Sequence, residues 1–323
     1  ILIGLVGSEM CIRDRNMSFQ KHFFIAVDKL MDGAQNRRVR KKLQGRGYEV
    51  SKDIVYDGSA PQACLLDTCV VPSGGKYPVM FYVHGGGFVA GDKYYRRALS
   101  CWHALLGYFV VNVNYGLGPD FKFPEPHRHL VSALNWVGEN AVRLNLDLSR
   151  MVVSGDSAGA YYAAALACIC ENAGLQQKIG AHTNLRFGAA VLNCGVYDMN
   201  ILLRSNVPLG LAPKILGDIA GISAEQMPTY EWRELCDLPS LVNPRFPSTF
   251  LTYAKKDIFC GGQSEALIAA LQKNGVYFEQ FHTKTLADNH CFSLNWNTRA
   301  AKKNNSLTAD FLTRFAKGEL IHN

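Results

Sequence analysis

A serine flanked by glycines, in the stretch VVSGDSAGA, is the strongest chemical signal in this chain of 323 residues. Gly155-Asp156-Ser157-Ala158-Gly159 fits the pattern G-x-S-x-G and lies between a short apolar run and a long helical one. In that setting a sharp strand-to-helix turn lifts the serine hydroxyl above the sheet, and the small neighbours leave room for it. The bare pattern arises by chance in roughly one chain in ten of this length. Its position between a strand and a helix therefore carries the prediction that Ser157 is a nucleophile.

Three consecutive glycines, Gly85 to Gly87, follow the strand-forming run VMFYVH. Glycine loses more backbone freedom on folding than any other residue, so we expect bare backbone to approach a substrate here. A serine that attacks an ester produces a tetrahedral oxyanion, which backbone N–H groups stabilise. The sequence predicts that Gly86 and Gly87 supply two of these groups and that Ala158, after the nucleophile, supplies a third. His84 is expected to hold the loop by hydrogen bonding rather than to transfer protons.

The motifs HGGGF and GDSAG, with the intervening NYGLGPDFKFPEP, resemble the hormone-sensitive-lipase-like family of α/β-hydrolase esterases, from about Tyr77 to about Phe292. The resemblance implies an α/β-hydrolase fold and the hydrolysis of carboxylic esters. In that family the middle motif is usually Tyr-Arg-Leu-Ala-Pro-Glu, whereas this chain has Gly116, Gly118 and Asp120 at the second, fourth and sixth positions. These departures affect residues that support the site rather than the catalytic ones.

A serine nucleophile needs a base, and the base needs an orienting acid. In the family that the chain resembles, these follow in the order serine, acid, histidine. Three histidines come after the strand expected at 249–254: His282 in strand-like sequence, His322 beside the C-terminus, and His290. His290 is expected on a loop after the last strand, and it matches the family's His-x-Phe. We therefore predict that His290 is the base.

The acid is predicted to be Asp257, which comes just after an expected strand. Catalytic groups gather at the carboxyl ends of parallel strands. The family pattern there is Asp-Pro-Leu-x-Asp; this chain keeps the first aspartate and has Gly261 in place of the second. Asp288 is the competing candidate, although its position two residues before His290 makes the required ring geometry awkward.

These residues predict acyl transfer to water through an acyl-enzyme on Ser157. His290 would take and return the proton, and Asp257 would orient the imidazole. No metal and no organic cofactor is required, and the expected partner is a small-molecule ester. The family favours short acyl chains, so acetyl to hexanoyl esters are expected. The alternatives are a serine peptidase on the same fold and a non-catalytic ligand-binding protein, which is disfavoured because all three triad positions are filled.

The elements that must position these residues follow an alternating pattern from Pro78 onward. Near-continuous apolar runs separated by helices predict an α/β fold, a mostly parallel sheet with helices on both faces. The strand-like runs are 79–84, 108–115, 151–155, 188–193, 249–254 and 276–282, and the helical stretches are 127–144, 158–174 and 261–275. Residues of about 17–45 and 199–246 interrupt the pattern and are expected to form a helical cap on one domain of residues 17–323.

The first sixteen residues, ILIGLVGSEMCIRDRN, lack the basic region and the long apolar core of a signal peptide. They resemble translated sequencing-adapter read-through, so residues 1–16 are set aside as a non-native scar. Without an export signal after Met17, we expect a cytoplasmic protein whose ten cysteines are reduced.

The formal net charge is +7, and the cluster RRVRKK at Arg37–Lys42 accounts for much of the excess. No aromatic residues interleave with it, so a solvated helix face is favoured over a nucleic-acid patch. No run reaches eighteen apolar residues, so no membrane insertion is expected. The sequence leaves a homodimer open.

Overall fold

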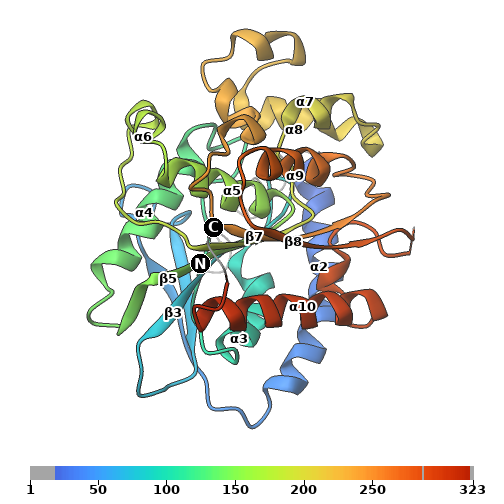
Figure 1. Cartoon of the computed structure of the whole chain (residues 1–323). Helices are drawn as coiled ribbons and strands as arrows, with labels where there is room; N and C mark the ends of the chain where they lie inside the picture. Colours follow the sequence, from blue (N-terminus) through green and yellow to red (C-terminus); the bar gives the residue numbers. More distant parts are fainter. Residues whose placement is uncertain (1–18, 286, 321–323) are drawn as a thin grey trace, which may run out of the picture.

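An eight-stranded sheet carries helices on both faces in the computed structural model of the chain, which describes residues 19–285 and 287–320 (Figure 1). The strand order is β1-β2-β4-β3-β5-β6-β7-β8. The strands are β1 (Glu49–Val55), β2 (Leu65–Val70), β3 (Tyr77–Val83), β4 (Phe109–Val113), β5 (Leu146–Asp156), β6 (Ala189–Asn193), β7 (Ser248–Ala254) and β8 (Phe278–Thr283).

Only the first edge of the sheet is antiparallel. β2 runs antiparallel to both β1 and β4, and every pairing from β4 through β3 to β8 is parallel. The mostly parallel sheet expected from the sequence is therefore confirmed, and the six predicted runs correspond to β3 through β8. β1 and β2 are additional strands that the alternating pattern did not indicate.

The helices occupy the connections between strands, as a parallel sheet requires. The described α-helices are α2 (Phe19–Leu43), α3 (Arg97–Ala104), α4 (Glu125–Glu139), α5 (Ala158–Cys170), α6 (Ala173–Ile179), α7 (Met199–Arg204), α8 (Leu211–Ala220), α9 (Gln263–Lys273) and α10 (Arg299–Ala316). Short 3₁₀ segments are η1 (Lys93–Arg96), η2 (Pro208–Gly210), η3 (Ala224–Thr229), η4 (Arg233–Cys236), η5 (Leu238–Leu241) and η6 (Phe292–Leu294).

Alternate residues of each strand enter two different cores. In β3, Val79 and Phe81 pack with α4, α5 and α9, whereas Met80 packs with α3 and α10. Figure 1 shows these two helix layers on opposite sides of the strands. Because side chains alternate along a strand and both faces are covered, an unbroken apolar run such as VMFYV is buried throughout.

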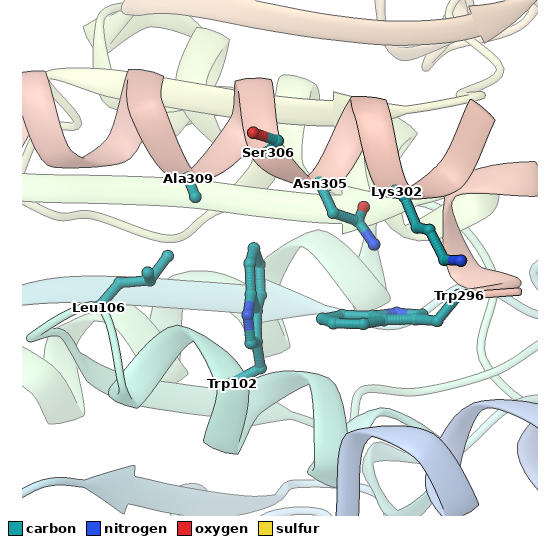
Figure 2. Close-up of a pocket in the computed structure, with 7 residues that line it drawn as sticks. All are labelled: Trp102, Leu106, Trp296, Lys302, Asn305, Ser306 and Ala309. Atoms are coloured by element: carbon teal, nitrogen blue, oxygen red, sulfur yellow. The ribbon is translucent and has the colours of Figure 1, made fainter. Parts of the chain in front are cut away.

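On the second face, α3 and α10 lie beside each other with a small pocket between them (Figure 2). Trp102 of α3 and Trp296, just before α10, meet edge to face with ring centroids 5.1 Å apart. Aromatic pairs prefer this arrangement to face-to-face stacking. The pair fixes the spacing of the two helices on the face of the sheet opposite α5.

The two segments expected to form a cap contact each other across the chain. α2 packs against α8, and Gln20 of α2 donates a hydrogen bond to Asp218 of α8 at 2.6 Å. Figure 1 places α7 and α8 together at one end of the molecule. Their role as a cap stays a prediction.

The basic cluster at residues 37–42 falls on the last turns of α2. Val39 is buried there and Lys41 is exposed, while the side chains of Arg37, Arg38, Arg40 and Lys42 lie outside the described structure. The segment assigned as a scar, residues 1–16, also lies outside it. Within the described ranges, no helix combines the length and apolarity that a bilayer span requires.

Candidate active site

Ser157 stands at the junction of β5 and α5, near the middle of the sheet. Its backbone has φ 54° and ψ −123°, a region that non-glycine residues rarely occupy. Such a conformation costs about 1–3 kcal/mol and persists only where the surroundings enforce it. The amide of Ser157 donates to the carbonyl of Asn193 at the end of β6, at 2.8 Å. The predicted strand-to-helix turn is therefore present, with its serine strained.

The structure brings Ser157, His290 and Asp257 into one hydrogen-bonded chain. His290 Nε2 lies 2.9 Å from Ser157 Oγ, and His290 Nδ1 lies 2.9 Å from Asp257 Oδ2 and 3.1 Å from Oδ1. A carboxylate only accepts hydrogen bonds, so Nδ1 carries the ring hydrogen. The lone pair of Nε2 then faces the serine, whose hydroxyl donates to it. This tautomer is the one in which the imidazole acts as a base toward the serine.

Burial and charge set the pKa values of this pair. The Asp257 side chain is 1% exposed and that of His290 is 17% exposed. Burial lowers the pKa of His290, but the neighbouring Asp257 carboxylate outweighs it, and the net pKa lies well above 6.5. Burial raises the pKa of Asp257, yet the His290 charge and the amides of Phe259 and Cys260 bring it below its usual value. Those two amides donate to Asp257 Oδ1 at 2.8 and 2.9 Å.

Asn289 joins the two loops that carry the acid and the histidine. Its Oδ1 accepts from the amides of His290 at 2.8 Å and Ile258 at 3.1 Å, and its Nδ2 donates to the carbonyl of Lys256 at 2.8 Å. No sequence motif singled out Asn289, although it directly precedes His290. Because both loops meet at one side chain, Asn289 positions His290 relative to Asp257.

Asp288, the competing candidate for the acid, forms its hydrogen bonds with threonines. Its Oδ2 accepts from the Thr285 hydroxyl at 3.0 Å, and its backbone carbonyl accepts from the hydroxyl of Thr283 at 2.8 Å. The carboxylate that contacts His290 is that of Asp257. His282, in β8, stacks on Tyr253 with ring centroids 5.2 Å apart.

The glycine-rich loop lies directly beside the serine. Gly86 and Gly87 line the same space as Ser157 and His290, and Ala158, the residue after Ser157, begins α5. Gly86 has φ 137° and Gly87 has φ 61°, conformations that favour glycine. A Cβ at Gly86 would collide with the carbonyl of Ala90, and one at Gly87 with the ring of Phe24. Both positions therefore require glycine; their role as oxyanion donors, with Ala158, stays a prediction.

His84 anchors the glycine-rich loop through hydrogen bonds and ring packing. Its Nδ1 donates to the carbonyl of Gly85 at 2.8 Å, and its ring stacks on Tyr115 with centroids 4.7 Å apart. The hydroxyl of Tyr115 donates to the backbone carbonyl of His84 at 2.8 Å. Burial lowers the pKa of His84, so the neutral ring is favoured. These contacts agree with the expected anchoring role.

A buried ion cluster lies beneath the serine, and nothing in the sequence motifs indicated it. Arg96 Nε and Nη2 donate to both carboxylate oxygens of Asp156, at 2.8 and 2.7 Å, and Tyr82 donates to Asp156 at 2.8 Å. Arg96 also pairs with Asp28 of α2 at 3.3 Å. Burial raises the pKa of Asp28, whereas Arg96 outweighs burial at Asp156 and lowers the pKa of that carboxyl. Asp156, the residue before Ser157, is thus linked through Arg96 to Asp28 of α2.

The space above Ser157 is nearly filled by aromatic side chains. Phe23 and Phe24 of α2 pack on Phe259, with ring centroids 6.3 and 6.5 Å apart, and Phe259 meets the ring of His290 edge to face at 5.2 Å. The remaining cavity has a volume of about 40 Å³. Because about 10–15 Å³ of such space holds one water molecule, the cavity accommodates only a few waters.

Gly116 and Gly261, which differ from the family pattern, lie close to neighbouring groups in the fold. At Gly116, a side chain would collide with Phe121 and with His129, whose Nδ1 accepts from the Gly116 amide at 3.1 Å. At Gly261, an added Cβ would lie 3.1 Å from the carbonyl of Asp257. Ring packing therefore occupies the position where the family has an arginine.

Two groups of side chains at the site have the spacing of metal ligands. They are Cys194, His290 and Cys291, and Asp257, Cys260 and His290, each with ligand atoms within 4.8 Å of one another. Both nitrogens of His290 are already engaged, by Asp257 and by Ser157. Among the described residues, these groups therefore belong to the hydrogen-bonded site, and no role for a metal is assigned to them.

Residues 80–293, more than half of the chain, match a family described as alpha/beta hydrolase fold. Esterase LipI of Mycobacterium tuberculosis is 39% identical over 120 residues, covering 36% of this chain and 37% of that protein. Tuliposide A-converting enzyme 2 of Tulipa gesneriana is 33% identical over 123 residues, covering 34% of this chain and 32% of that protein. The chain thus aligns with about a third of the length of these relatives.

Solved structures extend the likeness over nearly the whole chain. The crystal structure of esterase B from Lactobacillus rhamnosis superposes with a TM-score of 0.72 at 21% identity, covering 93% of this chain and 99% of that one. A bacterial heroin esterase gives a TM-score of 0.71 at 20% identity over 90% of this chain and 92% of that one. At this identity the likeness shows a shared fold.

Proposed function

The chain belongs to the α/β-hydrolase fold family, and from this premise we propose that it is a serine hydrolase that cleaves carboxylic esters. The observation that carries the proposal is the hydrogen-bonded chain from Asp257 through His290 to Ser157, beside the glycine loop. Relatives named as esterases support an ester as the substrate class.

The first chemical step follows from the tautomer. As the Ser157 oxygen attacks the ester carbonyl, its proton moves to Nε2 of His290 over a 2.9 Å hydrogen bond. The imidazolium that forms keeps the hydrogen on Nδ1 and donates it in a hydrogen bond to the Asp257 carboxylate. This carboxylate stays ionised because two backbone amides also donate to it. The strained serine stands above the sheet, where the substrate carbonyl can reach it.

The oxyanion that results is assigned to the N–H groups of Gly86, Gly87 and Ala158. Removing a single donor of this kind costs about 10²–10³ in kcat in other serine hydrolases. His290 then returns its proton to the leaving alcohol and leaves an acyl group on Ser157. Water, activated by the same imidazole, releases the acid and restores the serine.

The aromatic packing over the serine supports a short acyl group. A cavity of about 40 Å³ bounded by Phe23, Phe24 and Phe259 admits an ester only when these rings move aside. A short acyl chain requires the smallest displacement, so acetyl to hexanoyl esters are the proposed substrates.

The test is turnover of p-nitrophenyl esters from acetyl to dodecanoyl by the wild type and by Ser157→Ala. We expect turnover that declines with acyl length in the wild type and a loss of about 10⁴-fold or more in kcat in the variant. A fluorophosphonate should label the wild type and not the variant. A folded wild type that binds these esters but neither turns them over nor takes the label would show a ligand-binding protein instead.

A further inference from the structure

We propose that Cys69 and Cys101 form a reversible disulfide that links β2 to α3 covalently. The two sulfurs lie 2.9 Å apart, closer than a comfortable non-bonded sulfur contact. A disulfide has its sulfurs about 2.05 Å apart, so the pair needs to close by less than about 1 Å. Both cysteines are free thiols in the described structure, and both are buried.

An ion pair beside the two sulfurs fixes the helix against the strand. Arg97 donates to Asp67 Oδ2 through Nε at 2.8 Å and through Nη2 at 2.7 Å. Asp67 and Cys69 are two residues apart in β2 and therefore point to the same face of the strand. Arg97 and Cys101 are four residues apart in α3 and therefore share one side of the helix. The ion pair and the sulfur pair are thus successive contacts of one junction, and the first holds the second in register.

Of the two cysteines, Cys101 is among the residues that line a described cavity. A cavity of about 430 Å³ is lined by Cys101 together with Lys52, Tyr94 and Arg97. The hydrogen bond from Cys69 lowers the pKa of Cys101; burial opposes this effect and Arg97 supports it. The same contact raises the pKa of Cys69. Cys101 is therefore the attacking thiolate, because nucleophilic exchange requires the deprotonated sulfur.

The oxidant that we assign is an anionic, low-molecular-weight disulfide such as oxidised glutathione, because the cationic Lys52 lines the cavity beside Arg97, which is paired with Asp67. The Cys101 thiolate attacks one sulfur of the reagent, its S–S bond breaks, and one glutathione leaves. Cys69 then loses its proton, its sulfur bonds to Cys101 Sγ, and the second glutathione leaves. In sum, two protein thiols are oxidised to one disulfide and oxidised glutathione is reduced to two thiols.

The link would enclose a functionally important part of the chain. Residues 69–101 include β3, the glycine loop with Gly86 and Gly87, and Arg96. Closing this loop covalently removes conformational freedom from the unfolded chain. The oxidised protein should therefore unfold at a higher temperature than the reduced one.

The test incubates the full chain with oxidised glutathione or with dithiothreitol, blocks the remaining thiols after denaturation, and maps peptides without reduction. We expect a cross-linked peptide pair containing Cys69 and Cys101, lighter by two hydrogen atoms, and a higher midpoint of thermal unfolding in the oxidised sample. Cys101→Ala and Cys69→Ala should remove both the cross-link and the dithiothreitol dependence. Cys64→Ala, a buried cysteine of the same region outside the pair, should keep both.

Three outcomes would overturn the proposal, and each can be detected in the wild-type protein without a variant. In the first, both thiols remain alkylatable after oxidation. In the second, Cys101 stays as a mixed disulfide with glutathione. In the third, the cross-link joins Cys194 to Cys291, whose sulfurs also lie within 4.8 Å.

Discussion

At the scale of single residues, Asp257 controls the proton affinity of His290. As the proposed base, His290 works when it is neutral, and its net pKa is raised above 6.5. Activity should therefore be lost as the pH falls through a value above about 6.5. In Asp257→Asn the carboxylate charge is gone, so the acid limb should move to lower pH while kcat falls by about 10⁴-fold. Profiles of kcat/KM against pH with p-nitrophenyl butyrate measure both effects; an unmoved limb would contradict the assignment of Asp257.

Asn289 offers a second test at this scale, because it positions His290 without touching a substrate. In Asn289→Ala the two loops lose their shared side chain, so we expect kcat to fall by up to about 10²-fold with little change in KM. Asn289→Asp keeps the oxygen that accepts from His290 and Ile258 and should recover part of the loss. Equal losses in both variants would argue against positioning through that oxygen.

The candidate residues that the sequence revealed share one property: each belongs to a local pattern. Ser157 lies in its pentapeptide and Gly86 in its glycine run, while His290 and Asp257 follow expected strands. Arg96, Asp28 and Asn289 escaped notice because their importance arises from contacts with distant residues. Arg96 meets Asp156 sixty positions along the chain. No spacing rule along the sequence describes such a contact.

At the scale of elements, we propose that α2 covers the site through Phe24, whose ring lies against Gly87. Removing the ring should enlarge the space above Ser157 for longer acyl groups. For Phe24→Ala we expect the ratio of kcat/KM for octanoyl over butyryl esters to rise by about tenfold or more, since even one methylene is worth about 1–3 kcal/mol in such pockets. Phe19→Ala, on the same helix at a 55% exposed position outside the site, is the control and should leave the ratio unchanged. A ratio that shifts equally in both variants would refute the role of Phe24.

The strands show why sequence patterns reveal some elements and not others. β3 through β7 contain buried apolar runs, β8 (FEQFHT) is more polar, and each of the six was predicted. β1 is mostly exposed, and its sequence EVSKDIV carries charges, so it lacks that signature. β2 buries Asp67, which Lys93 and Arg97 neutralise from another part of the chain. A buried aspartate in a strand becomes understandable only when its partners are known.

At the scale of the whole molecule, we expect the packing of α10 on the sheet to contribute to stability separately from the site. Phe311 of α10 is buried against Phe250 of β7, with ring centroids 5.7 Å apart, on the face away from α5. Phe311→Ala should lower the free energy of unfolding by about 3–5 kcal/mol because it leaves a cavity. The kcat/KM of the folded fraction should stay near the wild-type value. Denaturant unfolding together with active-site titration separates the two effects, and a matching fall in kcat/KM would show that the faces are coupled.

The aromatic closure over Ser157 also has a kinetic consequence. If α2 must move before any reagent reaches Ser157, opening of the site precedes the encounter. The rate of covalent inactivation should then level off at one ceiling as reagent concentration rises, whatever the size of the reagent. Apparent affinities would all be weakened by one common factor, the fraction of molecules that are open. The uncovered pocket would then determine which esters are preferred. The motion of α2 would set the rate at which any ester first reaches Ser157.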